Sequence, residues 1–538
     1  MKLRTIGAAH EVTGSCHLLE VNDKRILIDC GLEQGRNLYE NPGFELLDEK
    51  IDYVFLTHAH IDHSGKLPLL CKNGFEGQII ATFPTVDLCR IMLQDSAHIQ
   101  ETEAEWQNRK GKRAGEPECE PLYTMDDALT AIDLLVPCSY NERIRVEPGI
   151  ELRFTDVGHL LGSASIEVWI TEGELTKKIV FSGDLGNIGL PILKDPTFTR
   201  SADYVVVEST YGNRLHEKRS VDYPESLASI LRETFSKGGN VVIPSFAVGR
   251  TQELLYFFRE IKEQQLLPEY DDFEVYLDSP LAIEATKVFT GNMRECFDEA
   301  ALKLVDAGIN PLVFAGLKIC ASSEDSKSIN FIEKPKVILS ASGMCEAGRI
   351  RHHLKHNLWR EECTILFVGF QAIGTLGRRL VDGADVVRLF GETIEVRARI
   401  EDFKGMSGHA DQKELLNWLH GFETPLERVI VVHGEDTVTD EFATIVEEEL
   451  QVSAWAPYPC GELNLATNTI LTDGVKIPVK PKKATQRRDD AAFERLLSAG
   501  KQLLDVIYRS ESISNKDKAR FESQLRNLAE KWAPWEDE

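Results

Sequence analysis

The distribution of apolar and polar residues predicts strands that alternate with helices. Short apolar runs recur along the chain, and most of them end in Gly, Ser, His or Asp: RILIDCG, YVFLTHAH, KIVFSGDLG, YVVVESTYG, NVVIPSFAVG, KVILSASGM, TILFVGF and RVIVVHGE. Several runs precede a segment with helical periodicity, such as GRTQELLYFFREIKEQ, and DQKELLNWLHGF is another helical segment. This pattern is typical of an α/β protein. Functional groups are expected at the carboxyl ends of such strands, where the His and Asp clusters fall.

The end of the chain has a different pattern. Residues 477–490, IPVKPKKATQRRDD, are rich in Pro, Lys and Arg and predict a linker. Beyond the linker, AAFERLLSAGKQLLDVIYRS and NKDKARFESQLRNLAEKW carry apolar residues at helical spacing and predict two amphipathic helices. We expect a helical hairpin that packs on its own chain or on a second copy. A nucleic-acid arm that uses the basic linker is the alternative.

Composition narrows the class of protein. A chain of 538 residues is too long for one ordinary core, so two or three domains are expected. Hydrophobic content of 42% and charged content of 28% are typical of soluble globular proteins. We find no apolar run of membrane-spanning length and no signal-peptide pattern, so no membrane partner is expected. The 11 cysteines form no CxxC pair, which favours the reducing cytoplasm and argues against a Cys-rich zinc site.

The net charge of −26 restricts how a nucleic acid could bind. So acidic a chain repels polyanions at long range. A nucleic-acid substrate would therefore need local cations, helix N-termini or metal ions to hold it. We accordingly expect a narrow cleft with cations inside it and not a shallow open groove.

The segment VFLTHAHIDHSGKLP, residues 54–68, carries the clearest chemical signal. His58 and His60 alternate at the end of an extended strand, so their side chains point to the same side. After a turn, Asp62 and His63 would reach a second position. Imidazole nitrogens and carboxylate oxygens suit zinc and similar divalent ions. These ligands exceed the number that one tetrahedral ion with an open position needs, so we infer two ions. A single histidine at this place would instead be explained as an ordinary solvated loop residue.

Other strand ends supply further candidate ligands. His159 lies in FTDVGHLLGSAS, Asp184 in KIVFSGDLGN and His433 in VIVVHGE. A buried carboxylate after an apolar strand is costly unless it is paired or bound to metal, so Asp184 suits a bridging position. Taken singly, His159 and His433 are equally well explained as ordinary structural residues.

Together these motifs resemble the metallo-β-lactamase superfamily, which implies an αββα sandwich and two Zn²⁺ ions, with Mn²⁺ as the alternative. The resemblance implies the following ligand sets: His58, His60 and His159 for one metal, and Asp62, His63 and His433 for the other. It also implies that Asp184 bridges the ions and that Asp29, in ILIDCG, supports the cluster from behind the ligands.

The superfamily motif does not define the substrate, because thioesterases, lactonases, lactamases and nucleases share it. Further segments resemble the β-CASP nucleases: VVESTYGNR, VVIPSFAVGRTQELL, LDSPLA, ILSASGMCEAGRIRHHLKH, SGHADQ and VVHGE. This resemblance, over about residues 1–460, implies a metallo-β-lactamase domain of residues 1–208 and 396–465, an inserted β-CASP α/β domain of residues 209–395, and a linker with a C-terminal helical extension at 466–538. His433 in the final motif implies RNA as the substrate in preference to DNA.

The resemblance implies hydrolysis of RNA phosphodiester bonds, in RNA processing or decay, by a hydroxide that two metal ions activate. Asp62 would orient or deprotonate the nucleophile. His409, paired with Glu208, would protonate the leaving oxygen. Outside this motif context, Glu208 would be an ordinary capping carboxylate and His409 an ordinary turn histidine. The implied partner is single-stranded RNA, and a homodimer or an RNA-processing complex is compatible with the helical tail.

Two strand–turn–helix segments suit phosphate, because backbone N–H groups at a helix N-terminus point at an anion. The candidate contacts are Ser245 and Arg250 in PSFAVGRTQELL, and Ser342, Gly343 and Arg349 in SASGMCEAGRIRHHLKH. Close packing of turns is the alternative explanation. His352, His353 and His356 are expected to form a polar helix face and not a third metal site. Residues 108–113, NRKGKR, are expected to form a solvated basic loop.

Two other functions remain open at this point. One is a small-molecule ester or thioester hydrolase on the same metal core, which the β-CASP-like motifs and the Glu208/His409 pair argue against. The other is a catalytically idle scaffold, which the complete set of ligands argues against. The mode of cleavage, endonucleolytic or exonucleolytic, stays undetermined, as does the RNA.

Overall fold

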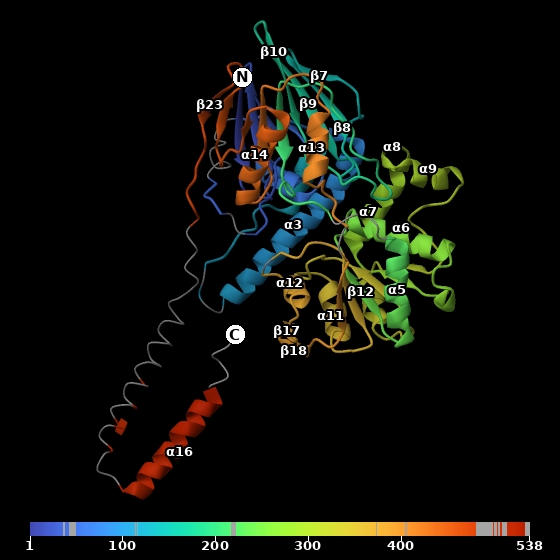
Figure 1. Ribbon diagram of the computed structural model, residues 1–538, viewed down its shortest axis with the longest axis vertical. Coiled ribbons are helices and arrows are strands. Elements are labelled where there is room, and N and C mark those ends of the chain that lie inside the picture. Colours follow the sequence, from blue (N-terminus) through green and yellow to red (C-terminus); the bar gives the residue numbers. More distant parts are fainter. Residues whose placement is uncertain are drawn as a thin grey trace. The chain divides into compact units, whose positions relative to one another are not determined.

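The structure is a computed structural model that describes residues 1–35, 38–41, 50–112, 115, 117–216, 222–372, 374–403, 406–479 and 514–532, with single positions between 499 and 510. The chain divides into two compact units, Met1–Pro478 and Val479–Glu538. The first unit combines two large mixed sheets with a third, parallel sheet and their covering helices, which confirms the expected α/β class (Figure 1).

An eight-stranded sheet contains both ends of the first unit. Its strand order is β23 (Thr469–Thr472), β22 (Glu462–Asn464), β1 (Lys2–Gly7), β2 (Cys16–Val21), β3 (Lys24–Ile28), β4 (Tyr53–Phe55), β5 (Gln78–Thr82) and β6 (Leu135–Cys138). Strands β3 to β6 are parallel to one another, so their carboxyl ends lie at one edge of the sheet.

A seven-stranded sheet packs against the first sheet. Its order is β21 (Ala454–Trp455), β20 (Arg428–Val432), β11 (Tyr204–Glu208), β10 (Leu175–Phe181), β9 (Ala164–Glu172), β8 (Ile150–Asp156) and β7 (Ile144–Glu147). Leu19 and Ile26 of the first sheet share a buried core with Ile166 and Val206 of the second. Strands β10, β11 and β20 are parallel neighbours, so their carboxyl ends also lie side by side.

Helices cover the outer faces of this sandwich. The first sheet is covered by α2 (Leu67–Lys72), α3 (Phe83–Gly111) and α4 (Met125–Asp133), and the second by α13 (Gln412–His420) and α14 (Asp436–Leu450). The short α1 (Ile61–Ser64) follows β4 directly. These layers give the αββα sandwich that the sequence predicts. The basic segment NRKGKR differs from the prediction, because its residues 108–111 continue α3 as helix, while Arg113 lies outside the described residues.

The third sheet is parallel throughout. Its order is β14 (Leu317–Ile319), β13 (Val275–Leu277), β15 (Val337–Ser340), β12 (Val241–Pro244), β16 (Thr364–Phe367) and β19 (Arg399–Asp402). Because its faces are covered by helices, the central strands are uninterrupted apolar runs. Val241 and Ile243 pack toward α5 (Tyr223–Ser236) and α6 (Arg250–Glu263), whereas Val242 packs on the opposite side.

The helices that cover the third sheet lie on both sides of β12 (Figure 1). One side carries α5, α6 and α7 (Pro280–Gly291), and the other carries α11 (Ile350–Asn357) and α12 (Leu376–Val381). The remaining elements are α8 (Met293–Cys296), α9 (Glu299–Asp306), α10 (Ser323–Ile329), the 3₁₀ turn η1 (Pro268–Tyr270) and the hairpin β17 (Val386–Leu389) with β18 (Glu392–Glu395).

Two edge strands lie near the expected segment boundaries at residues 396 and 465. β19 pairs with β16 in the third sheet, up to Asp402. β22 and β23 extend the first sheet to Thr472. Edge strands are recognised by their pairing partners, which local sequence does not reveal.

In the second unit, the helix expected at NKDKARFESQLRNLAEKW is present as α16 (Asn515–Trp532). The linker residues 480–490 and most of the segment AAFERLLSAGKQLLDVIYRS lie outside the described residues. Within the described part of the chain, no helix combines the length and apolar character needed to cross a membrane. The cysteines, all within described segments, are free thiols.

Candidate active site

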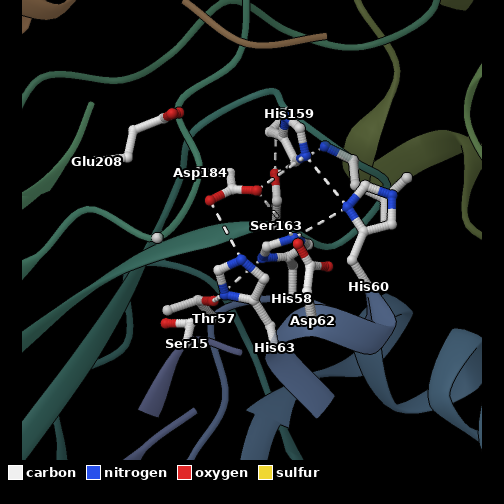
Figure 2. A network of polar contacts seen from close by, with 12 residues as sticks. Ser15, Thr57, His58, His60, Asp62, His63, His159, Ser163, Asp184 and Glu208 are labelled. Atoms are coloured by element: carbon white, nitrogen blue, oxygen red, sulfur yellow. Dashed lines mark hydrogen bonds and ion pairs between the residues drawn. The ribbon is translucent and has the colours of Figure 1, made fainter. Parts of the chain in front are cut away.

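The predicted site residues converge where parallel strands of both sandwich sheets end. His58, His60, Asp62 and His63 follow β4, with Asp62 and His63 in α1. The other predicted ligands also follow strands: His159 comes after β8, Asp184 after β10, and His433 after β20. Figure 2 shows the side chains of His58, His60, His63 and His159 directed toward the carboxylate of Asp184. The expectation that functional groups lie at carboxyl ends of strands is therefore met.

The first group of side chains surrounds one oxygen of Asp184. Oδ2 of Asp184 lies 3.5 Å from His58 Nε2 and 3.4 Å from His159 Nε2. His60 Nδ1 lies 3.1 Å from His58 Nε2 and 3.2 Å from His159 Nε2. The ligand atoms of these residues are all within 4.8 Å of one another, so one ion could contact the whole group.

The second group faces the other oxygen of the same carboxylate. Oδ1 of Asp184 lies 3.2 Å from His63 Nε2 and 3.6 Å from His433 Nε2, and these two nitrogens are 3.2 Å apart. Oδ2 of Asp62 lies 3.8 Å from His433 Nε2. Asp184 thus presents one oxygen to each group, which is the geometry that a bridging ligand requires.

Hydrogen bonds at the outward nitrogens orient the imidazoles. Nδ1 of His63 donates to Asp29 Oδ2 at 2.7 Å, and Nδ1 of His159 donates to the Gly408 carbonyl at 3.1 Å. Nδ1 of His433 lies 3.1 Å from the hydroxyl of Thr210. With the proton on Nδ1, each Nε2 carries a lone pair that points into the cluster, the tautomer that a metal ligand needs.

Asp29 contacts the ring of His63 from the side opposite the cluster. It is buried, and its oxygens accept hydrogen bonds from Thr57 N at 2.8 Å, Thr57 Oγ1 at 2.9 Å and Ser15 Oγ at 3.2 Å, in addition to His63. The Thr57 hydroxyl also lies 3.1 Å from His58 Nδ1, so Asp29 reaches rings of both groups through one network.

The donor set fits divalent cations. Asp184 is buried, and its Oδ1 accepts no hydrogen bond from the described residues. Facing imidazole nitrogens lie 3.1–3.2 Å apart, so either a proton or a cation must lie between their lone pairs. Asp29 and Glu208 add further buried carboxylates to the same region, and such charges are costly without compensation. Two divalent ions would satisfy all three conditions.

The protonation tendencies of the rings agree with this fit. Burial lowers the pKa of His58, His60 and His159, which keeps these imidazoles neutral and able to bind a metal. Burial also acts on His63, but the carboxylates of Asp184 and Asp29 outweigh it and raise the pKa of His63 well above its usual value. The second group therefore attracts positive charge, which a proton or a metal ion can supply.

Glu208 and His409 form the predicted pair beside the ligands. Glu208 ends β11 and is 1% exposed, and its Oε1 accepts a hydrogen bond from Leu185 N at 2.6 Å. His409 Nδ1 lies 3.2 Å from Glu208 Oε2 and 4.0 Å from Asp184 Oδ2. Burial acts to lower the pKa of His409, but the carboxylates of Glu208, Asp184 and Asp62 together raise it to about 9. These carboxylates thus favour the protonated form of His409 next to the cluster.

Three of the predicted phosphate contacts have polar partners within the chain. Ser245 is buried and its hydroxyl lies 3.0 Å from Thr251 Oγ1. The guanidinium of Arg250 is paired with Glu253 and donates to the Met406 carbonyl.

Arg349 is engaged in the same way, because its guanidinium pairs with buried Asp278 at 2.7 Å and donates to the carbonyls of Cys320 and Ala321. Ser342 and Gly343 form the turn after β15, where Gly343 lies against the ring of Phe246. The histidines of α11 also depart from the expected polar face, because His353 is buried and lies 2.6 Å from Asp278.

Several supporting residues were not anticipated from the sequence. Thr57 and Thr210 orient imidazoles through their hydroxyls, and Gly408 does so through its carbonyl. Thr57 precedes His58 in LTHAH, and Thr210 follows Glu208 by two residues in ESTYG. A hydroxyl residue so close to a candidate site residue could have been predicted to orient it. A backbone carbonyl such as that of Gly408 carries no sequence signal.

Comparison with protein families divides the chain into three matched segments. Residues 11–232 match the metallo-beta-lactamase superfamily, residues 251–380 match the Beta-Casp domain, and residues 393–457 match the Zn-dependent metallo-hydrolase RNA specificity domain. The order of these segments follows the order of the motifs along the chain.

Whole-chain relatives agree with this division. The chain is 38% identical to "Ribonuclease TTHA0252" of Thermus thermophilus over 81% of its own length and 94% of that protein. It is 31% identical to "Transcription termination factor FttA" of Methanocaldococcus jannaschii and of Methanosarcina mazei, over 85% of its own length and 70% of theirs. The protein therefore belongs to the β-CASP ribonuclease family of the metallo-β-lactamase superfamily.

Proposed function

We propose that the protein is a metal-dependent ribonuclease that hydrolyses phosphodiester bonds of single-stranded RNA in RNA processing or decay. The observation that carries the proposal is the placement of the Glu208–His409 pair beside two ligand groups that share Asp184. The name of the Thermus relative and the match to an RNA specificity domain support RNA as the substrate.

The two ligand groups would hold two Zn²⁺ ions, with Mn²⁺ as the alternative. His58, His60 and His159 would hold one ion, Asp62, His63 and His433 the other, and Asp184 both. Bound there, the ions would lower the pKa of a water molecule and neutralise charge on the phosphate. The buried Asp29 would keep the ring of His63 in the ligating tautomer.

Side chains of the protein would orient the attacking water and protonate the leaving oxygen. Asp62 is 20% exposed, so its carboxylate lies at the open side of the cluster, where it can accept a hydrogen bond from the attacking water and orient it. His409 would donate its proton to the leaving oxygen. Glu208 favours the protonated form of His409 and fixes its ring.

Strand pairing suggests how the proposed domains are bounded. We place the inserted β-CASP domain between β11 and Asp402, the last residue of β19, and the second part of the metallo-β-lactamase domain from there to Thr472. A cytoplasmic location, and assembly as a homodimer or within an RNA-processing complex through the C-terminal helices, are part of the same proposal.

The test is incubation of Zn²⁺-loaded protein with end-labelled single-stranded RNA and, separately, with a model ester. His409→Ala serves as the variant. His352→Ala is the matched control, because this exposed histidine stacks on Phe390 and makes no contact with the cluster.

We expect cleavage of RNA by the wild type and by His352→Ala, and its loss in His409→Ala at full metal occupancy. The product ladder would show whether cuts are internal or terminal. Intact RNA together with rapid ester hydrolysis would contradict the proposal and favour a small-molecule hydrolase.

A further inference from the structure

A hollow of about 380 Å³ opens next to the Glu208–His409 pair. Its lining comes from residues 211–216 after β11, residues 368–371 after β16, Arg378 and Val381 of α12, Asp402 with Phe403 at the end of β19, and Met406 with Ser407 before His409. Its volume falls in the range of about 300–1,000 Å³ that small-molecule sites occupy. The hollow therefore has room for a group the size of a nucleotide.

The wall of this hollow holds His409 in place. His216 Nε2 donates to the His409 carbonyl at 2.9 Å, and His409 N donates to Ser407 Oγ at 3.2 Å. The ring of Tyr211 meets the ring of His409 edge-on, with centroids 6.1 Å apart. A molecule in the hollow would thus lie beside the group that we propose as the proton donor.

Apolar side chains are exposed at the hollow without an evident packing role. Phe370 is 56% exposed and Leu215 is 61% exposed, and both line the hollow from different segments. The next residue, Gln371, donates from Nε2 to the carbonyls of Gly343 at 3.0 Å and Gly369 at 3.1 Å, which links this segment to the turn after β15. An exposed aromatic ring at this position is a surface on which a base can stack.

A cation that has no ion pair among the described residues lines the same hollow. The guanidinium of Arg214 lies 4.8 Å from the ring centroid of Tyr211, and Arg214 makes no ion pair within the described segments. Arg378, which also lines the hollow, is by contrast paired with Asp382 at 2.9 Å. Asp402 also lines the hollow, but in a chain of net charge −26 the guanidinium of Arg214 still provides local attraction for an anionic group.

We propose that this hollow receives one unpaired nucleotide of the RNA, next to the phosphodiester bond that is cleaved. Its base stacks on Phe370 and packs against Leu215, and its phosphate pairs with Arg214. The proposal rests on the proposed ribonuclease function and deepens it, because a base inside a duplex is already stacked and paired and does not enter. The hollow thereby selects single-stranded RNA.

The test is steady-state cleavage of single-stranded RNA by Phe370 variants. Phe370→Leu keeps an apolar side chain but removes the aromatic face, whereas Phe370→Tyr keeps that face. Since base stacking contributes about 1–3 kcal/mol per base, we expect Phe370→Leu to raise KM between about 5-fold and 150-fold, with kcat little changed. Phe370→Tyr should keep the wild-type KM. The matched control is Phe331→Leu, which alters a residue that is 84% exposed and lines a different hollow.

A second measurement links the effect to one nucleotide. RNAs that each carry a single abasic site are cleaved by the wild type and by Phe370→Leu. We expect one abasic position to raise the KM of the wild type and to leave that of Phe370→Leu unchanged, because both changes remove the same contact. Equal KM values for Phe370→Leu, Phe370→Tyr and the wild type would overturn this inference alone. Absence of RNA cleavage by the wild type would overturn the ribonuclease proposal and this inference with it.

Discussion

Replacement of Glu208 by glutamine tests how the proposed proton donor is kept protonated. The substitution preserves the size of the side chain and one oxygen that can accept the hydrogen bond from Leu185 N, so the local structure should persist. It removes the negative charge 3.2 Å from His409 Nδ1. Bound metal ions would offset the charges of Asp184 and Asp62, so Glu208 is the carboxylate whose effect on the pKa of His409 persists in the loaded enzyme.

The magnitude follows from the separation of the two groups. An opposite charge at such a distance shifts a pKa by about 1–3 units. The protonated imidazole is the active form, so activity is present below the pKa of His409 and is lost as the pH rises through it. Glu208→Gln should therefore move the alkaline limb of the kcat profile down by about 1–3 units, with a loss of about 10-fold per unit at pH values above both limits. Below both limits, kcat should approach that of the wild type.

The assay is single-turnover cleavage of end-labelled RNA between pH 5.5 and 10, with zinc content measured at each pH. Glu253→Gln provides the matched control, because that carboxylate is paired with Arg250 and not with His409. An alkaline limb that stays in place in Glu208→Gln would refute the assignment of His409 as the proton donor. A uniform loss of activity at every pH would indicate that Glu208 acts by positioning alone.

Three further predictions concern the metals and the stability of the fold. Asp29→Asn should weaken zinc binding by about 10–100-fold, as measured by competition with a chromophoric chelator, because the single amide oxygen cannot accept from both Thr57 N and His63 Nδ1; unchanged affinity would contradict this. At a free zinc concentration of about 100 times Kd, each bound ion should stabilise the fold by about 2.7 kcal/mol, so removal of zinc should lower Tm. Asp184→Asn should show a smaller decrease in Tm when zinc is removed. Asp278→Ala should lower the free energy of unfolding in urea by about 3–5 kcal/mol, because buried His353 and Arg349 lose their partner, and a change below about 1 kcal/mol would refute that reading.

Much of the site was predictable from local sequence because ligands of this kind follow apolar strands. HAHIDH, SGDLG and VVHGE each combine a buried run with a ligand at its carboxyl end, and those residues meet in the structure. The strand-and-helix alternation identified the α/β class for the same reason, because burial and periodicity are properties of short segments.

Tertiary structure decided which side chains face the cluster and which are committed elsewhere. Glu208 and His409 are 201 residues apart in sequence and meet only because β11 ends beside the loop that precedes α13. Arg349 resembles a phosphate ligand in sequence, yet buried Asp278, far from it along the chain, takes its guanidinium. Nothing in the local sequence of Arg214 indicates that it lines a hollow next to His409, where it has no ion pair among the described residues.

The difference between the features that the sequence predicts and those that only the tertiary structure reveals has a physical cause. A strand and the ligand that follows it are specified by their immediate neighbours, because apolar periodicity and turn residues act within a few positions. The pairing of charges, the partner of an edge strand such as β19 and the walls of a hollow depend on groups that come together only after the sheets have packed. The sequence alone thus determined the metal-binding chemistry of this protein, and the tertiary structure decided where its substrate can lie.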